Sequence, residues 1–427
     1  HDIRKSRANY ENRLLSKGPK ALYKYTKSKL TSKVSKPVVK NKDGELCAND
    51  FSTAEAFADH FESVYVNELC DNFPEILSPR VSESLDTIEF PEDIVYEELC
   101  RLDSVSSPGP DNLSPHVLRS CARTLSKPLS HIFHLSFTTS RLPSLWKKAH
   151  VTAIFKKGEK TEAANYRPIS LTSVCVKIME RIIVKYLLNF LLENNVIPST
   201  QHGFLPHKST VTCLLQCVNQ WSLSLDEGSP VDIVYLDFAK AFDRVPHNRL
   251  FYKLEYIGIR GRLLEWIVAF LTARTFSVRI GSCVSTERSV CSGVPQGSVL
   301  GPALFLSYIA DLSFQITSDH IFYADDCKIY ANPLTDHNSL QLDLHSVKKW
   351  CQNWLIPLNL DKCVLMHLGT NNPLLTLNIA NQQLKVVEYH SDLGITITPS
   401  LSWSQHIGEI VKRANRSIFL FSKAFRN

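Results

Sequence analysis

Apolar residues follow two alternating patterns along the chain. Short runs rich in β-branched and aromatic residues predict strands, and longer stretches with apolar residues three or four positions apart predict helices such as 117–137. A mixture of this kind predicts an α+β domain with an antiparallel sheet. The predicted strands are 149–155, 231–236, 276–280, 320–323, 328–330 and 364–368.

Helical patterns also occur near both ends of the chain. Apolar residues of 54–64 lie on one helical face after a basic stretch, and 404–424 forms an amphipathic helix. Residues 72–91 contain several prolines and no sustained period, which predicts a connector. We therefore divide the chain into a basic linker and helical segment over 1–95, a main domain over 105–398 and a C-terminal segment over 399–427.

Composition indicates an ordinary globular protein. Of 427 residues, 44% are hydrophobic and 21% are charged, which excludes a disordered or fibrous chain. The net charge is +6, with Lys and Arg crowded in 4–42 and 147–160. Such clusters suit a polyanionic partner, although a solvated basic face explains the first cluster equally well. Because no uncharged apolar run reaches about 18 residues and no initiator methionine is present, we expect a soluble fragment without a membrane span.

The cysteine pattern predicts an intracellular protein with reduced thiols. Twelve cysteines are scattered singly along the chain. The one close pair, Cys213 and Cys217, lacks the second pair or the histidines that a zinc site needs. We therefore expect core thiols, without disulfides or zinc.

Acidic residues at the ends of predicted strands carry the candidate chemistry. Asp237 directly follows the run 231–236, and Asp325 and Asp326 occupy the tip between two β-rich runs, as in a hairpin. An Asp-Asp pair alone is most often a polar turn. Phosphoryl transfer, however, uses two hard cations about 3.5–4 Å apart, and magnesium prefers oxygen ligands. The three acids supply the required kind and number of groups.

Three segments around these acids resemble motifs of reverse transcriptases from non-LTR, LINE-type retrotransposons. They read LDFAKAFD, VPQGSVLGP and YADD and occur in the family's order, at Leu236–Asp243, Val294–Pro302 and Tyr323–Asp326. The resemblance covers roughly 105–425, and further similar segments are Asn165–Leu171, Gln201–Phe204 and Leu393–Ile395. It implies a right-hand polymerase fold, with fingers from about 105 to 230, a palm on a split βαβ antiparallel sheet, and the truncated start of a thumb over 399–427.

The resemblance also implies an activity and its partners. The chain would be an RNA-directed DNA polymerase that extends a primer 3′-hydroxyl with dNTPs, using two Mg²⁺ ions for which Mn²⁺ can substitute. Asp237, Asp325 and Asp326 would be the catalytic, metal-binding acids, with Asp237 and Asp325 the principal ligands. Expected partners are an RNA template, a DNA primer or an RNA–DNA hybrid, and dNTPs. The resemblance implies a ribonucleoprotein of the nucleus and cytoplasm, and the oligomeric state stays open.

Nucleotide-contacting residues follow from the same motifs. Phe242 would lie beneath the incoming sugar and exclude a ribose 2′-hydroxyl; its alternative role is a core phenylalanine. Gln296 offers both a donor and an acceptor to the template or sugar, and the backbone at Gly297 can approach a nucleotide closely. Without its context, that segment would be only a turn before a helix.

Cations at matching positions would bind the triphosphate. A bidentate guanidinium suits phosphate oxygens, which favours Arg167 over Lys156 and Lys157. Lys362 would donate a proton to the departing pyrophosphate. For the three lysines, a surface position without function is the alternative.

Several features limit the resemblance. Pro206, His207 and Lys208 replace an expected Gly-Arg, and Ala310 stands where the family usually has asparagine. We expect Asp243 to form a local hydrogen bond at a helix start. No endonuclease motif is recognisable. One alternative is an RNA-dependent RNA polymerase, which the Phe242 ring disfavours; another is a degenerate or domesticated RNA-binding remnant without polymerase activity, which the intact acids disfavour.

Overall fold

The computed structural model describes residues 36–68 and 73–425, together with isolated positions before 36. Most of the predicted basic linker lies outside the described residues. By its internal contacts the chain forms two units, of which the larger is Val38–Glu388 and the smaller combines His1–Pro37 with Tyr389–Asn427. Among the described residues, every helix is too short or too polar to span a lipid bilayer.

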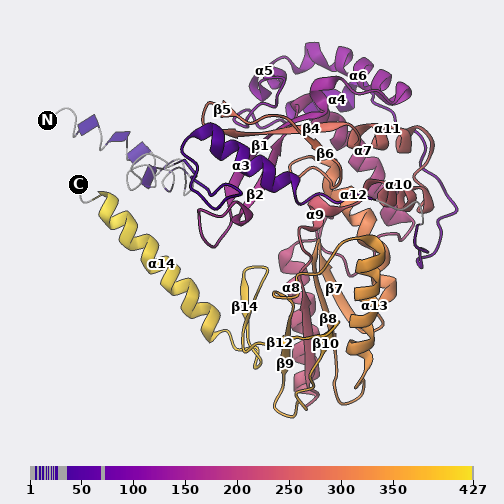
Figure 1. Ribbon diagram of the computed structural model, residues 1–427, viewed down its shortest axis with the longest axis vertical. Helices are drawn as coiled ribbons and strands as arrows, with labels where there is room; N and C mark the ends of the chain where they lie inside the picture. Colours follow the sequence, from indigo (N-terminus) through magenta and orange to yellow (C-terminus); the bar gives the residue numbers. More distant parts are fainter. Residues whose placement is uncertain are drawn as a thin grey trace. The chain divides into compact units, whose positions relative to one another are not determined.

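One sheet of the larger unit contains most of the predicted strands, and we call it the acidic-turn sheet (Figure 1). Its strands pair antiparallel, except for the short edge strand β12, which is parallel to β9. The prediction of an antiparallel sheet in a mixed α/β domain is therefore confirmed. The strand order is β12 (Lys385–Val386), β9 (Val364–Leu368), β3 (Val231–Leu236), β8 (Asp326–Ala331) and β7 (Asp319–Tyr323).

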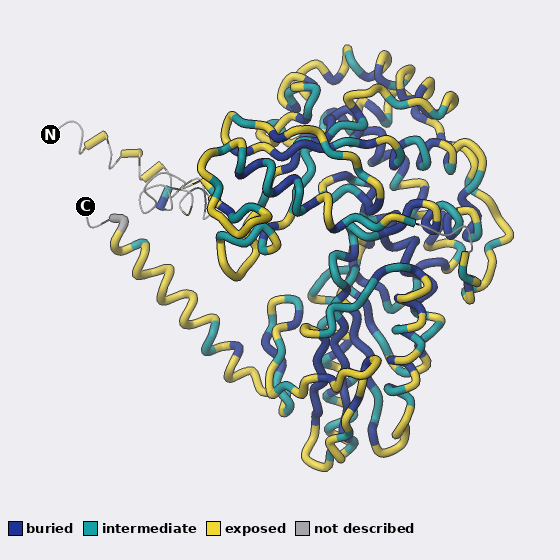
Figure 2. The backbone as a smooth tube through the Cα atoms, viewed as in Figure 1, coloured by how far each residue is buried: buried dark blue, intermediate teal, exposed yellow. Residues whose placement is uncertain are grey.

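Two helices, α8 (Thr210–Asp226) and α13 (Ser339–Trp354), cover opposite faces of the acidic-turn sheet. Successive side chains of a strand point to opposite faces. Tyr330 of β8 packs edge-on against Trp221 of α8, with ring centroids 5.8 Å apart, whereas Cys327 lies near Cys351 of α13. Because both faces are covered, every residue of β3 is buried, as the dark blue core of Figure 2 shows.

A second sheet lies elsewhere in the larger unit, and we call it the β1 sheet. Strand β1 (Lys148–Phe155) pairs antiparallel with β2 (Tyr166–Leu171) and parallel with β4 (Arg274–Ile280). The short strands β5 (Cys283–Val284) and β6 (Arg288–Val290) both pair with β4.

Helix α3 (Asp50–Glu62) packs on the β1 sheet and confirms the helical pattern predicted there. Asn49 and Ser52 form a reciprocal capping box that starts the helix. Phe57 packs edge-on against Tyr166 of β2 at 4.8 Å. The larger unit therefore includes α3, although the main domain was predicted to begin at 105.

The remaining helices of the larger unit build an apolar core with the acidic-turn sheet. The predicted helix over 117–137 is two helices, because Cys121 leaves helical backbone geometry at φ −99° and ψ 18°. Residues 73–91 form the connector expected from their prolines. The bounds are α4 (Glu92–Cys100), α5 (Pro115–Ser120), α6 (Ala122–Thr139), α7 (Val174–Glu193), α9 (Ala241–Arg244), α10 (His247–Tyr256), α11 (Gly261–Leu271) and α12 (Leu300–Ile309), with short 3-10 turns η1 (Ser144–Trp146), η2 (Ala163–Asn165) and η3 (Ala310–Gln315).

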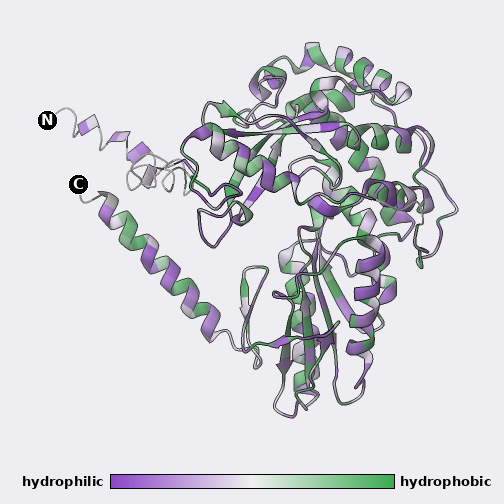
Figure 3. Ribbon diagram, in the orientation of Figure 1, coloured by the Kyte–Doolittle hydropathy of each residue, from purple (hydrophilic) through white to green (hydrophobic). Residues whose placement is uncertain are grey.

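The smaller unit contains the predicted amphipathic helix, α14 (Ser404–Phe425), and the hairpin of β13 (His390–Asp392) with β14 (Ile395–Ile397). Apolar and polar residues alternate along α14 in Figure 3. Thr396 of β14 donates a hydrogen bond to Glu409 of α14 at 2.9 Å. A further two-residue hairpin, β10 (Asn378–Ile379) with β11 (Gln382–Gln383), belongs to the larger unit.

A buried lysine connects four elements of the larger unit. Lys253 of α10 is 2% exposed, and its Nζ donates to the Tyr308 carbonyl at 2.6 Å and to Asp311 at 2.5 Å. The ammonium also lies 3.6 Å from the ring centroid of Trp354. The indole of Trp350 donates to the same Asp311 oxygen at 3.2 Å. The pair thus ties α10 to α12, η3 and α13.

Removal of this lysine is expected to destabilise the fold. Lys253→Ala leaves the Asp311 carboxylate buried without its cation, and we expect the free energy of unfolding to fall by about 3–5 kcal/mol. Lys349→Ala, at an exposed position of α13, is the control and should change it by less than about 0.5 kcal/mol. Urea unfolding measures both variants, and equal stabilities would contradict the structural role.

Candidate active site

Strand pairing brings two of the predicted acids to one edge of the acidic-turn sheet. Leu236 of β3 lies opposite Cys327 of β8, and Tyr323 of β7 pairs with Asp326. The chain therefore reverses at Ala324 and Asp325, which confirms the predicted hairpin. Asp237, the residue after β3, consequently stands beside that turn.

A pocket of about 670 Å³ opens at this edge. Its lining contains the carboxylates of Asp237, Asp243 and Asp325, several cations and the loop between β6 and α12. These parts come from segments far apart in the sequence. Of the predicted site residues, the lining includes Asp237, Asp325, Lys156, Lys157, Arg167, Phe242, Gln296, Gly297 and Lys362.

Asp326 is the predicted ligand that does not line the pocket. It is the first residue of β8 and is exposed, whereas the neighbouring Asp325 faces the pocket. Side chains of consecutive residues near a strand point in different directions, so adjacent acids do not share one site automatically. Asp237 and Asp325 are therefore the predicted acids that line the pocket.

Asp237 and Asp325 differ in their surroundings. Burial and the nearby negative charge of Asp237 raise the pKa of Asp325 above its ordinary value. The Asp237 carboxylate accepts a hydrogen bond from Lys362 Nζ at 2.8 Å. One acid is thus paired with a cation, while the other is held in an environment that disfavours its charge.

A divalent cation fits this donor set only with help from a substrate. Among the described residues, no three His, Cys, Asp or Glu side chains form a group that could hold a metal ion. Magnesium, however, keeps several waters and is often bound by one or two carboxylates together with substrate phosphates. Asp237 and Asp325, together with the phosphates of a substrate, match that second mode.

Cations of the pocket repel one another. Burial, Arg167 and Lys362 lower the pKa of Lys156. Burial and the charges of Lys156, Lys362 and Arg167 likewise lower the pKa of Lys240. Such a cluster lacks enough nearby negative charge and suits a polyanion.

Lys240 was not predicted as a site residue, although the motif around Asp237 contains it. It lines the pocket, and its backbone is left-handed, with φ 55°. Asn359 also lines the pocket, and its backbone N–H donates to the Asp237 carbonyl at 2.7 Å. In the sequence, Lys240 and Asn359 are marked only by lying close along the chain to Asp237 and Lys362. Their neighbours share that closeness, so the sequence does not single them out.

Phe242 is fixed by two other rings. Its ring stacks on Phe305 of α12 with centroids 4.3 Å apart, and the exposed Phe204 meets it edge-on at 6.0 Å. Stacking against a buried helix restricts the ring to one position. The pocket therefore has a rigid aromatic wall.

The turn between β7 and β8 is held by the segment before α8. The Gln201 carboxamide oxygen accepts from the backbone N–H of Gly203 at 2.7 Å and of Ala324 at 2.9 Å. A Cβ at Gly203 would lie 2.3 Å from the Ala324 nitrogen, so no larger residue fits there. Lys208, one of the departures from the family pattern, donates to the Gln201 carbonyl at 2.8 Å. The segment quoted for its resemblance thus supports the acidic turn directly.

The loop that carries Gln296 and Gly297 is anchored by backbone contacts. Ser170 N–H donates to the Gln296 carbonyl at 2.7 Å, and a Cβ on Gly297 would meet the Ser170 oxygen at 2.5 Å. The buried Glu180 of α7 accepts from the N–H groups of Val299 and Leu300 at 2.7 and 2.9 Å. Gly297 is required at its position because a Cβ would collide with Ser170 and because its φ is 115°.

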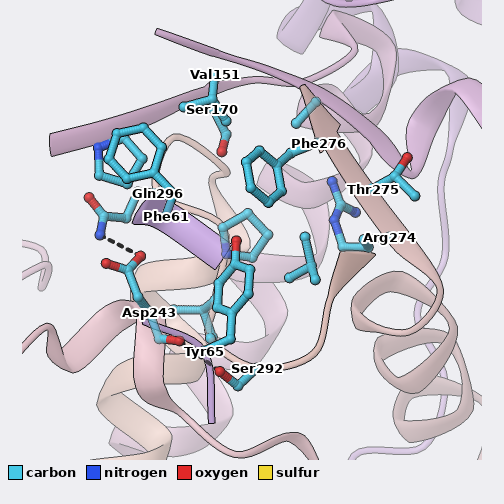
Figure 4. Close-up of a pocket in the computed structure, with 16 residues that line it drawn as sticks. Phe61, Tyr65, Val151, Ser170, Asp243, Arg274, Thr275, Phe276, Ser292 and Gln296 are labelled. Atoms are coloured by element: carbon cyan, nitrogen blue, oxygen red, sulfur yellow. Dashed lines mark hydrogen bonds between the residues drawn. The ribbon is translucent and has the colours of Figure 1, made fainter. Parts of the chain in front are cut away.

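Asp243 does not form the local hydrogen bond at a helix start that was expected. Its carboxylate accepts from Gln296 Nε2 at 2.8 Å, across 53 residues of sequence (Figure 4). Protein surrounds most of the carboxylate, and this desolvation raises its pKa to about 6. A short-range motif cannot reveal such a contact.

Comparisons with known proteins show what this chain is similar to. A family model described as reverse transcriptase (RNA-dependent DNA polymerase) matches residues 154–397. In Drosophila melanogaster, the chain is 28% identical over 412 residues to the RNA-directed DNA polymerase from mobile element jockey (91% of this chain, 44% of that protein). It is 28% identical over 433 residues to the probable RNA-directed DNA polymerase from transposon BS (92% and 46%). It is 26% identical over 428 residues to the probable RNA-directed DNA polymerase from transposon X-element (94% of this chain, 46% of that protein). The chain spans less than half the length of these relatives.

The effect of the Asp237 charge on the pKa of Asp325 can be measured. Asp237→Asn removes the nearby negative charge, and we expect the pKa of Asp325 to fall toward its ordinary value, so that this carboxyl ionises at lower pH. Carbon-13 NMR titration of labelled aspartates reports this shift. Asp361→Asn, an exposed acid beside Lys362, should leave the Asp325 titration unchanged. An unchanged pKa in Asp237→Asn would show that the two acids do not interact.

Proposed function

The chain belongs to the reverse transcriptase (RNA-dependent DNA polymerase) family, and on that premise we propose that it extends a primer 3′-hydroxyl with dNTPs on an RNA template. The observation that carries this proposal is the pocket in which Asp237 and Asp325 stand beside a cluster of cations. A nucleoside triphosphate is a polyanion that is bound together with divalent cations, and this pocket offers groups for both.

The residues divide the work by charge. Asp237 and Asp325 would hold magnesium, or manganese in its place, and the ions would neutralise charge on the phosphates and activate the attacking hydroxyl. Arg167, Lys156 and Lys240 bind phosphate oxygens. Arg167 offers a planar fork to two oxygens, and each lysine offers a point charge. Most of the rate enhancement then comes from positioning and electrostatics.

Lys362 has a second role in this proposal. Its ammonium holds a proton at Nζ, 2.8 Å from the Asp237 carboxylate. Contact with the Asp237 carboxylate fixes the position of this ammonium at the pocket. It can then transfer that proton to the departing pyrophosphate.

The proposal extends to subdomains and partners. The acidic-turn sheet with α8 and α13 corresponds to the palm, the β1 sheet contributes to the fingers, and residues 399–427 begin the thumb. The partners are an RNA template and a DNA primer or hybrid, and the working form is an intracellular ribonucleoprotein. The similarity to the transposon polymerases supports the nucleic-acid partners of this proposal.

Primer extension tests the activity and the acids together. With a DNA primer on an RNA template, dNTPs and Mg²⁺, we expect extension by the parent chain and a loss of at least about 100-fold in Asp237→Asn and Asp325→Asn. Asp326→Asn should lose less, because its side chain does not line the pocket. Asp361→Asn should extend at the parent rate. If no chain extends the primer while all bind the duplex, the chain is an RNA-binding remnant and the proposal fails.

Sugar selection tests the aromatic wall. Phe242→Ala removes the ring that would meet a ribose 2′-hydroxyl, and we expect kcat/KM for ribonucleotides relative to dNTPs to rise about 10–100-fold. Phe242→Tyr keeps the ring and should keep the selectivity. Single-nucleotide incorporation with matched dNTP and rNTP measures the ratio. Equal selectivity in the alanine variant and the parent would assign Phe242 to the core.

A further inference from the structure

Asp243 and Gln296 form a wall shared by two cavities. Both residues line the open pocket that contains Asp237. Both also line a smaller cavity of about 40 Å³, shown in Figure 4, whose lining includes Tyr65 and Arg274. The hydrogen bond from Gln296 Nε2 to the Asp243 carboxylate therefore lies at the boundary between the nucleotide pocket and the protein interior.

This bond fixes which end of the Gln296 side chain faces the pocket. A carboxamide has a donating nitrogen and an accepting oxygen, whereas an ionised carboxylate only accepts. With Nε2 committed to Asp243, the carboxamide oxygen of Gln296 is turned away from it. A neutral carboxamide of the same shape could accept from Gln296 Nε2 or donate to the Gln296 carboxamide oxygen, and would not set this orientation.

The backbones of the two segments are fixed independently of that bond. Val294 N–H donates to the Phe242 carbonyl at 2.8 Å, and the Ser292 hydroxyl donates to the Asp243 carbonyl at 2.9 Å. The Gln296 carbonyl is held by Ser170. Since the main chain has its own anchors, the part of the loop that Asp243 controls is the Gln296 side chain.

The surrounding charges favour an ionised Asp243. Lys240 and Arg167 lower the pKa of this carboxyl against the effect of burial, and the resulting value of about 6 leaves it mostly ionised at neutral pH. A hydrogen bond to an ionised acceptor is stronger than one between neutral groups. The orientation of the Gln296 side chain is therefore held firmly at the neutral pH at which a polymerase of this kind would operate.

We infer that Asp243 is a positioning residue that acts through Gln296, turning its carboxamide oxygen toward the pocket as an acceptor for a hydroxyl of the incoming nucleotide's sugar. This inference rests on the proposed polymerase function. Because the contact is to the bound nucleotide and lies outside the acids that hold the metal, its loss changes the KM for dNTP and leaves kcat nearly unchanged.

A double-mutant cycle tests the inference in the full chain. Asp243→Asn keeps the shape, but its carboxamide can accept from the Gln296 nitrogen or donate to the Gln296 oxygen. Gln296→Met keeps the length of the side chain but removes both polar groups. We expect each single variant to raise the KM for dNTP by about ten-fold, with kcat within about two-fold of the parent. The double variant should be no worse than Gln296→Met alone, because Asp243 has nothing left to orient.

Each other outcome overturns a defined part of the argument. Penalties that multiply in the double variant, or a fall in kcat in Asp243→Asn, would show that Asp243 does not act through Gln296. If Asp243→Asn fails to fold while Gln296→Met folds and shows the parent's melting temperature, Asp243 is structural and the inference is wrong. A parent chain that neither extends a primer nor binds dNTP would remove the proposed function, and this inference with it. If the parent chain is active and the KM increases of the two single variants multiply in the double variant, only this inference fails.

Discussion

The pairing register of β3 with β8 is the constraint on which the candidate site depends. Leu236 opposite Cys327 places the residue after one strand beside the turn before the other. A shift of one residue would turn every side chain of a strand to the opposite face. Helices α8 and α13 cover the two faces of the sheet. A shift of β8 by one residue would move Lys328 and Tyr330 from the α8 face to the α13 face, where Cys327 now lies. Packing of the helices therefore fixes the position of the acids.

Opposite charges are brought together around that edge, where Asp237 and Lys362 form an ion pair. Asp325 is held where its charge is unfavourable, and the pKa values of Lys156 and Lys240 are lowered by burial and by neighbouring cations. Each set would gain from a ligand of the opposite sign, and a triphosphate with its metal ions supplies both signs in one complex. The site is preorganised for charge that arrives with the substrate.

Local patterns predicted the strands and the acids, and long-range contacts account for most of what they missed. Strands β3, β7, β8 and β9 follow from apolar runs because burial on the sheet selects those residues. The place of α3 on the β1 sheet could not be predicted, since it depends on Phe57 meeting Tyr166 more than 100 residues later. The bond between Asp243 and Gln296 is of the same kind. The helix break at Cys121 was missed because the apolar period continues through it.

The cluster around Lys253 restricts the order in which its members can change during evolution. The ammonium, the Asp311 carboxylate and the Trp350 and Trp354 rings satisfy one another in the interior. Replacing either charged residue first produces an intermediate with an uncompensated buried charge, whereas replacing both by apolar residues of similar volume can be neutral or stabilising. The two positions are therefore epistatic. We expect Lys253 and Asp311 to be substituted together, or one at a time after stabilising substitutions elsewhere in the chain. A single substitution at either position, without such compensation, is the least accessible route.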